Sequence, residues 1–159
     1  MPVDIGNSRE HISRFLTKHH IGVLATADAS GKPHAATVYL TFDQQFDIYF
    51  VTKQETQKSR NLKDNPRAAI AIYDQAAQTT VQVEGTVSEV TDPAKQEWVF
   101  NEIWDIAFKA SRTGPPTTRI DAGRYVAYKL LAPSLRIARF VVSLPSKDES
   151  IFEVVRTQQ

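Results

Sequence analysis

The chain has 159 residues, of which 42% are hydrophobic and 23% are charged, the composition of a soluble globular protein of one domain. Nineteen basic and 18 acidic residues give a formal net charge of +1, which excludes a global field that recruits nucleic acid or an anionic membrane. The absence of cysteine excludes disulfides, thiolate chemistry and cysteine–metal sites. No signal peptide or membrane-spanning apolar run is present, so we expect a cytoplasmic protein.

The first part of the chain predicts a helix followed by a β-hairpin. The helix occupies about residues 1–20, with Ser8 as a cap and Ile12, Phe15 and Leu16 on one face. Strands are expected at 21–26 and 34–42, joined by a turn at 28–32 in which Gly31 supplies a positive φ.

The rest of the chain predicts further short strands and two helices. Strands are expected at 48–52, 67–73, 79–90, 125–131 and 135–142, helices at 56–63 and 92–109, and a C-terminal appendage at 146–159. Gly85 is expected to mark a bulge. The helix expected at 92–109 carries two apolar rows, Phe100-Trp104-Phe108 and Val99-Ile103-Ala107. These rows are wider than one sheet face covers, and we expect the extra apolar surface to contact a second subunit. Together these elements predict one domain, residues 1–159, that is mostly β: an antiparallel barrel of six or more strands with flanking helices.

The segment from Ile48 to Leu62 carries the clearest chemical signal. A strand ends at Thr52, and Thr56 then caps a short helix whose first turn carries Lys58 and Arg60. Free backbone N–H groups, a hydroxyl and cations at one helix start form a receptor of the size of a phosphate.

Several segments, in this order, resemble the pyridoxamine 5′-phosphate oxidase-like, FMN-binding split-barrel proteins. They are the hairpin Gly22-Val-Leu-Ala-Thr-Ala-Asp-Ala-Ser-Gly-Lys-Pro-His34, the run Tyr49-Phe-Val-Thr52, then Thr56-Gln-Lys58, Asn61-Leu62, Asn65-Pro66 and Val81-Gln-Val-Glu-Gly85. The resemblance covers about residues 12 to 90.

The resemblance implies a six-stranded split β-barrel that binds FMN between the two protomers of a homodimer. The phosphate would lie at Thr52, Thr56 and Lys58, and the ring would lie along the strand from Thr37 to Thr41. The cofactor-binding residues that we expect on this basis are Thr37, Val38, Tyr39, Leu40, Val51, Thr52, Thr56, Gln57, Lys58, Thr80 and Gln82, with Trp104 and Arg136 from the second protomer. The function implied is an FMN-dependent oxidoreductase acting by two-electron transfer on a small organic substrate.

The chain departs from the oxidase itself at positions that touch cofactor or substrate. Ala36 and Thr41 stand where the oxidase has an arginine and a lysine, Gln57 replaces an arginine, and Thr80, with Gln82 nearby, replaces a glutamine. The C-terminal arginine–histidine signature is also missing. We therefore expect a smaller, divergent protein that does not oxidise pyridoxamine phosphate.

Alternative interpretations remain open at this point. A non-catalytic flavin-binding or sensory module, a deazaflavin-dependent reductase, and a haem-handling relative with His34 as its axial ligand all suit the same barrel. Four scattered histidines without cysteine argue against a structural metal. Residues 112–119 form either a lid over a substrate or a plain connector. No catalytic residue is assigned.

Overall fold

The structure, a computed structural model, describes residues 5–119, 123–142 and 144–157. Within them the strands are β1 (Ile21–Ala27), β2 (Pro33–Phe42), β3 (Ile48–Lys53), β4 (Arg67–Asp74), β5 (Thr79–Glu89), β6 (Tyr125–Leu131), β7 (Ser134–Arg139) and β8 (Glu153–Arg156). The helices are α1 (Ile5–Lys18), α2 (Gln57–Asp64) and α3 (Pro93–Ser111), with 3₁₀ turns at Pro116–Arg119 and Glu149–Ile151. Most of the predicted boundaries therefore lie within one or two residues of the observed ones.

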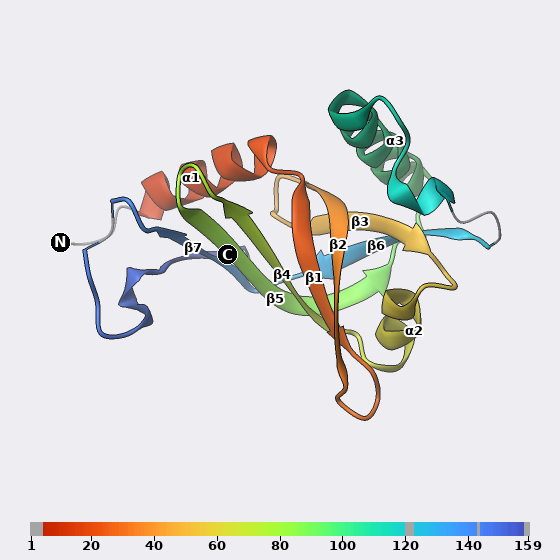
Figure 1. The fold of residues 1–159 in the computed structure, drawn as a ribbon, viewed down its shortest axis with the longest axis horizontal. Coiled ribbons are helices and arrows are strands. Elements are labelled where there is room, and N and C mark those ends of the chain that lie inside the picture. The colour runs from red at the N-terminus through yellow and green to blue at the C-terminus, as the bar shows by residue number, and fades with distance from the viewer. Residues whose placement is uncertain (1–4, 120–122, 143, 158–159) are drawn as a thin grey trace.

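Six of the strands close into an antiparallel barrel, as predicted. The strand order is β4-β1-β2-β3-β6-β5, and the pairing of β5 with β4 closes the ring (Figure 1). β7 pairs with β5 and β8 pairs with β7, which adds two strands outside the barrel. The closing pair is long, since it runs from Arg67↔Thr86 to Asp74↔Thr79.

The alternating sequence of the strands produces the barrel core. Side chains of alternate residues point inward, and Leu24, Leu40, Phe50, Ile70 and Val81 have almost no exposed surface. Burying each such side chain contributes about 1.5–3 kcal/mol, so this interior is the main source of stability.

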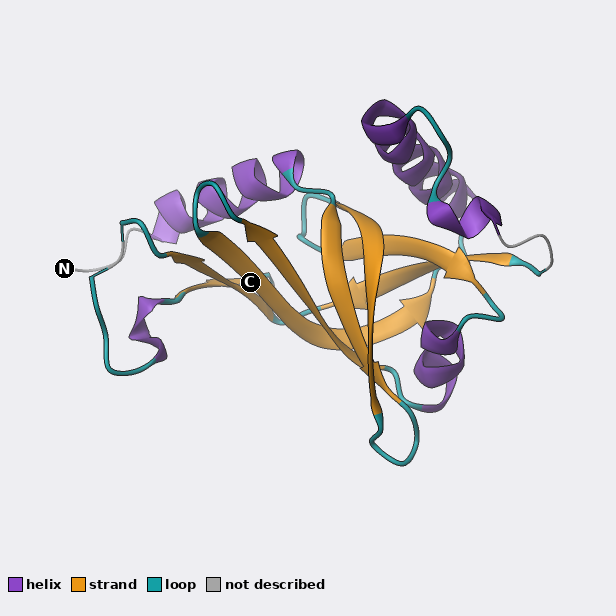
Figure 2. Ribbon diagram, in the orientation of Figure 1, coloured by secondary structure: helices purple, strands orange, loops and turns teal. Residues whose placement is uncertain are grey.

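The three helices lie on the outside of the sheet (Figures 1 and 2). α1 buries Ile12 and Leu16 against the barrel, as predicted. The prediction that Ser8 caps α1 is wrong. Ser8 lies within the helix, and its hydroxyl instead donates a hydrogen bond to Glu153 on β8 at 2.5 Å.

The C-terminal half corrects two further expectations. The register of β4 with β5 is unbroken at Gly85, so the predicted bulge is absent from this pairing. Glycine is required there because a Cβ would lie 2.2 Å from the carbonyl oxygen of Leu131. The segment expected as an appendage contains β8, which extends the sheet by pairing with β7.

Both predicted helix starts after the barrel strands are confirmed. Thr56 is the N-cap of α2, and the side chain of Asp92 caps α3 by accepting a hydrogen bond from the Lys95 backbone N–H. None of the helices in the described part of the chain is long and apolar enough to cross a membrane. The cytoplasmic location stays a prediction.

Candidate functional site

The barrel is split between β2 and β3. β2 pairs with β1 from Pro33 to Tyr39, but it pairs with β3 only from Leu40 to Phe42. On its other edge, β3 pairs with β6 along its whole length, from Ile48 to Lys53. The edge of β2 at residues 37–39 is therefore open, and the backbone groups on that edge point into the gap.

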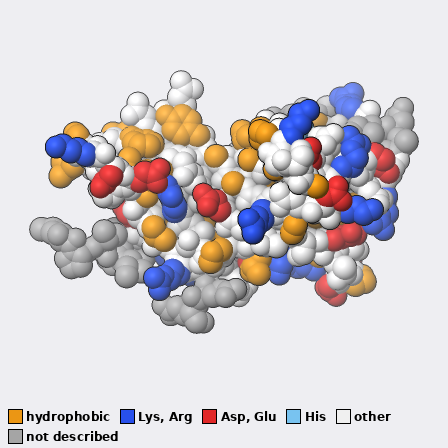
Figure 3. All heavy atoms as spheres, turned by 90° about the horizontal axis from the view of Figure 1, so that it is seen from below, with side chains coloured by type: hydrophobic (Ala, Val, Ile, Leu, Met, Phe, Trp, Pro, Cys, Tyr) orange, Lys and Arg blue, Asp and Glu red, His pale blue; other side chains and the backbone are white. Residues whose placement is uncertain are grey.

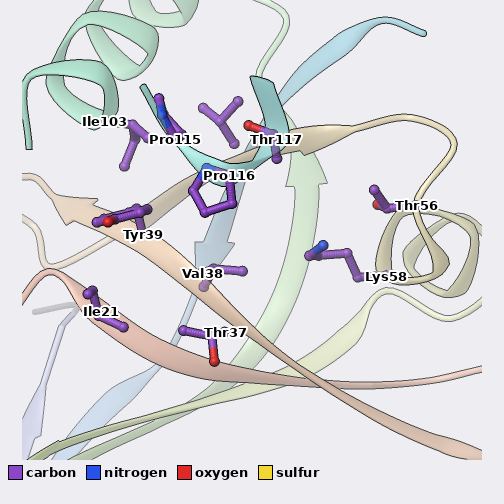
Figure 4. Close-up of a pocket in the computed structure, with 11 residues that line it drawn as sticks. Ile21, Thr37, Val38, Tyr39, Thr56, Lys58, Ile103, Pro115, Pro116 and Thr117 are labelled. Carbon is purple, nitrogen blue, oxygen red and sulfur yellow. The ribbon is translucent and has the colours of Figure 1, made fainter. Parts of the chain in front are cut away.

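A cavity of about 430 Å³ occupies this gap (Figure 4). Its lining residues come from β1, β2, β3, the start of α2, the middle of α3 and the turn after α3: Ile21, Thr37, Val38, Tyr39, Val51, Thr56, Lys58, Ile103, Pro115, Pro116 and Thr117. The volume lies within the range of small-molecule sites. Six of the residues predicted to bind the cofactor, those from β2, β3 and α2 in this set, share this one cavity.

The end of the cavity at α2 is built to receive an anion. The Thr56 hydroxyl lies 3.1 Å from that of Thr52, which is fully buried beneath it. The Ser59 backbone N–H donates to the Thr56 hydroxyl oxygen at 3.5 Å, whereas the N–H groups of Gln57 and Lys58 have no acceptor within the helix and could reach a bound oxygen. Lys58 follows in the first turn and lines the same cavity.

Lys58 is half-buried and has no ion-pair partner among the described residues. This burial lowers the pKa of Lys58 from its ordinary value of 10.5, because the cavity withholds water from the charged ammonium. A cation held in this way gains most from an anionic ligand, which replaces the missing solvation.

The other end of the cavity is apolar. Val38 and Ile103 are buried, while Tyr39 is half-buried and Ile21 is half-exposed. Figure 4 shows Pro116 and Thr117 on the opposite side of the space from Val38 and Thr37. Such walls suit a planar ring system that hydrogen-bonds to the open strand edge at its rim.

Residues 115–117 cover the cavity on the side opposite β2, and we call this segment the roof. Trp104 of α3 packs against Gly114, where a Cβ would lie 2.8 Å from the indole ring. The Thr118 hydroxyl donates to the Pro115 carbonyl oxygen at 2.7 Å and fixes the turn. The segment therefore faces the cavity and is more than a plain connector.

The roof, Ile21 and Ile103 were missed as site residues by the sequence reasoning. In the sequence, Ile21 resembles any other strand residue. The expectation that residues 112–119 form either a lid or a connector was the one indication of the roof. All of these residues reach the cavity through contacts between segments that are far apart in the sequence, and such contacts leave no local sequence pattern.

Three further predicted residues lie near the cavity without lining it. Leu40 is fully buried in the barrel core, and Thr52 lies beneath Thr56. Gln57 is exposed, and its amide donates to the Asn61 side chain at 2.8 Å.

The remaining predicted residues do not line the cavity of their own chain. Thr80 is buried and donates to the Ile72 carbonyl oxygen at 3.2 Å. Trp104 is 50% exposed behind the roof. Gln82 is half-buried on β5, and Arg136 opposite it on β7 pairs with Glu149 at 2.6 Å and covers the Phe152 ring.

Gln82 and Arg136 are joined to the cavity by a row of residues across the outer face of the barrel. Thr37 opposes Val23, Val23 opposes Ala71, Ala71 opposes Gln82, and Gln82 opposes Arg136. At the usual strand spacing, Gln82 is about 14 Å from Thr37 and Arg136 about 19 Å. Neither side chain reaches the cavity of its own chain.

The histidines do not form a metal site in the described part of the chain, where no group of three potential ligands occurs. His34 lies at the start of β2 and does not line the cavity. His19 pairs with Asp74 through its Nε2 atom at 3.1 Å. A haem iron held in this cavity would therefore find no histidine among the described lining residues.

Comparison with known proteins agrees with the fold and with the resemblance. The family profile of pyridoxamine 5′-phosphate oxidase matches residues 8–129. A pyridoxine/pyridoxamine 5′-phosphate oxidase of Pseudomonas paraeruginosa is 32% identical over 126 residues, which are 79% of this chain and 57% of that protein. This chain thus spans little more than half the length of that relative.

Two solved structures with the same fold carry different ligands in their names. A pyridoxamine 5′-phosphate oxidase-related, FMN-binding protein of Nostoc punctiforme has a TM-score of 0.60 at 15% identity and covers 98% of this chain and 97% of its own. The heme storage protein HutZ of Vibrio cholerae has a TM-score of 0.61 at 17% identity and covers 77% of this chain and 88% of its own. At such identities these structures show the shared fold alone. The profile match over most of the sequence, together with the Pseudomonas relative, shows that this chain belongs to the pyridoxamine 5′-phosphate oxidase family.

Proposed function

We propose that this chain binds FMN in the gap between β2 and β3 and serves as an oxidoreductase that transfers two electrons to or from a small organic substrate. The observation that carries the proposal is one cavity that joins an anion receptor at Thr56 and Lys58 to the open edge of β2 at residues 37–39. The phosphate of FMN would match the anion receptor, and its planar ring, which has a polar edge, would match the open edge of β2.

The residues present fit this cofactor. Thr56, the first N–H groups of α2 and Lys58 would hold the phosphate, and the edge of β2 would hydrogen-bond to the rim of the ring. Val38, Ile103 and Pro115 would exclude water from its faces. Bound FMN would supply the two-electron chemistry, while the protein supplies binding and orientation.

A homodimer forms part of the proposal. The outer face carries Val23 and Ala71 between the polar residues Thr37 and Gln82, and Val23 remains 46% exposed. A two-fold contact across this face would bring Gln82 and Arg136 of each copy toward the cavity of the other, which their own chain cannot do. Figure 3, which views the molecule from below, shows basic and acidic side chains interspersed with scattered hydrophobic groups on that face.

FMN suits the cavity better than the alternatives for the same barrel. Lys58 is the one cation among the described lining residues, enough for one phosphate but few for a longer, more anionic deazaflavin cofactor. Haem would need an axial ligand, and Tyr39 is the only such side chain on the described walls.

The proposal is tested by titrating the purified protein with FMN, riboflavin and haemin. We expect FMN to bind at one per chain, and riboflavin, which lacks the phosphate, to bind at least tenfold more weakly. Failure of FMN to bind, or tighter binding of haemin, would contradict the cofactor assignment.

A non-catalytic flavin-binding protein is the second candidate. It is favoured by the described cavity walls, which carry no carboxylate and no histidine as a general acid or base. Reduction of the FMN complex by NADH or NADPH, followed by reoxidation with organic acceptors, separates the two. Turnover with any such pair supports the enzyme, whereas a flavin that is never turned over supports the binder.

A further inference from the structure

A second, smaller cavity of about 80 Å³ lies behind the roof. It shares Val51, Ile103, Pro115 and Thr117 with the main cavity, so only these side chains separate the two spaces. Its remaining walls are the aromatic side chains of Phe100, Trp104 and Tyr125. We call this space the side compartment.

The side compartment has one polar anomaly. The hydroxyl oxygen of Thr117 is buried and has no hydrogen-bond partner among the described residues. A buried hydroxyl without a partner is unfavourable, and the other walls are almost entirely apolar. The neighbouring hydroxyl of Thr118, by contrast, is satisfied, because it donates a hydrogen bond to the Pro115 carbonyl oxygen.

A ligand atom in the side compartment would remove this cost. Rotation about the Cα–Cβ bond of Thr117 moves its hydroxyl among three staggered positions, so the hydroxyl can turn toward an acceptor in a neighbouring space. The space is about half the size of an engineered cavity that binds benzene, which corresponds to roughly three or four non-hydrogen atoms.

We propose that the side compartment is a substrate subsite that takes a compact apolar group bearing one carbonyl oxygen, with the Thr117 hydroxyl as its hydrogen-bond donor. The subsite deepens the proposed function and rests on it, because the group would belong to a substrate that occupies the main cavity next to the flavin. A site with a buried donor discriminates against an analogue that lacks the acceptor. The substrate class is therefore a small carbonyl compound rather than a hydrocarbon of the same shape.

The test uses acetone and its carbonyl-free isostere 2-methylpropene as probes of the whole chain, with and without FMN. The two tryptophans give two indole N–H signals in nitrogen-15 NMR spectra. Trp104 lines the side compartment, whereas Trp98 packs against Tyr49 outside it. We expect acetone to shift the Trp104 signal saturably, with a Kd of about 1 mM or weaker, to leave Trp98 unmoved, and to bind about fivefold more tightly than 2-methylpropene.

Variants of Thr117 separate a binding role from a structural one. Thr117→Val should reduce acetone affinity to that of 2-methylpropene, while raising the Tm by about 2–4 °C because it removes an unsatisfied hydroxyl. Thr118→Val should lower the Tm, since that hydroxyl is bonded, and Thr117→Ser should keep the preference for acetone.

Two results would overturn the subsite: no shift of Trp104 with acetone, or equal acetone affinity in the wild type and Thr117→Val. FMN binding is read separately from flavin absorbance. Acetone binding without FMN binding would contradict the proposed function alone, and the reverse would contradict the subsite alone.

Discussion

Lys58 shows how a single residue links the fold to the proposed chemistry. The capping of α2 by Thr56 places Lys58 in the first turn, and the split between β2 and β3 leaves it beside the cavity. Burial lowers the pKa of its ammonium group. A bound phosphate would favour the charged form and raise this pKa again.

The lowered pKa predicts how FMN affinity depends on pH. As the pH rises toward 10.5, Lys58 in the free protein loses its proton earlier than an ordinary lysine, so the affinity for FMN should fall over this range. Lys58→Arg stays charged and should show a flatter profile between pH 7 and pH 10. Fluorescence titrations at several pH values measure both profiles, and identical slopes would mean that Lys58 does not hold the phosphate.

At the scale of elements, α3 is fixed over the cavity by a polar cluster at its start. The Tyr49 hydroxyl donates to Asp43 at 2.7 Å, and Lys95 of α3 lies 3.4 Å from the same carboxylate. The Lys95 ammonium also covers the rings of Tyr49 and Trp98. The cluster ties the helix to the turn between β2 and β3.

Tyr49→Phe tests this cluster through pH. Burial, together with the hydrogen bond to Asp43, raises the pKa of Tyr49 above its ordinary value of 10.0. The unfolded chain therefore releases the phenol proton first, and the stability due to Tyr49 is present below pH 10 and lost as the pH rises beyond it. Urea unfolding should show the wild type more stable than Tyr49→Phe by about 0.5–1.5 kcal/mol at pH 8, and by less at pH 10.5. A difference that stays constant between these pH values would contradict the assignment.

The elements were predictable where a local pattern carries them. The alternating residues predicted the strands, and the capping residue Thr56 predicted the start of α2. Ser8 and Gly85 were misread because their roles depend on partners far along the chain, Glu153 and Leu131. The roof was not predicted as part of the site for the same reason. It lies opposite β2 in the folded chain, although the two segments are far apart in the sequence.

At the scale of the whole molecule, the proposed dimer would bring Gln82 and Arg136, which lie far from the cavity of their own chain, toward the cavity of the partner. Val23→Asp places a charge in the middle of this outer face without disturbing the core, because the Val23 side chain is half-exposed. We expect the variant to sediment as a monomer where the wild type sediments as a dimer, and to bind FMN more weakly. Ala94→Asp, at an exposed position in the first turn of α3, is the control and should stay dimeric. A wild-type monomer that binds FMN fully would contradict the dimer.

The central claim is that FMN binds with its phosphate at the start of α2, and a titration of Lys58→Ala with FMN tests it most directly. Lys63→Ala, an exposed lysine of the same helix outside the cavity, is the matched control. A charge-assisted hydrogen bond of about 1.5–3 kcal/mol predicts an affinity roughly 10- to 100-fold lower for Lys58→Ala and unchanged for Lys63→Ala. Equal affinities for the wild type and Lys58→Ala would contradict the account.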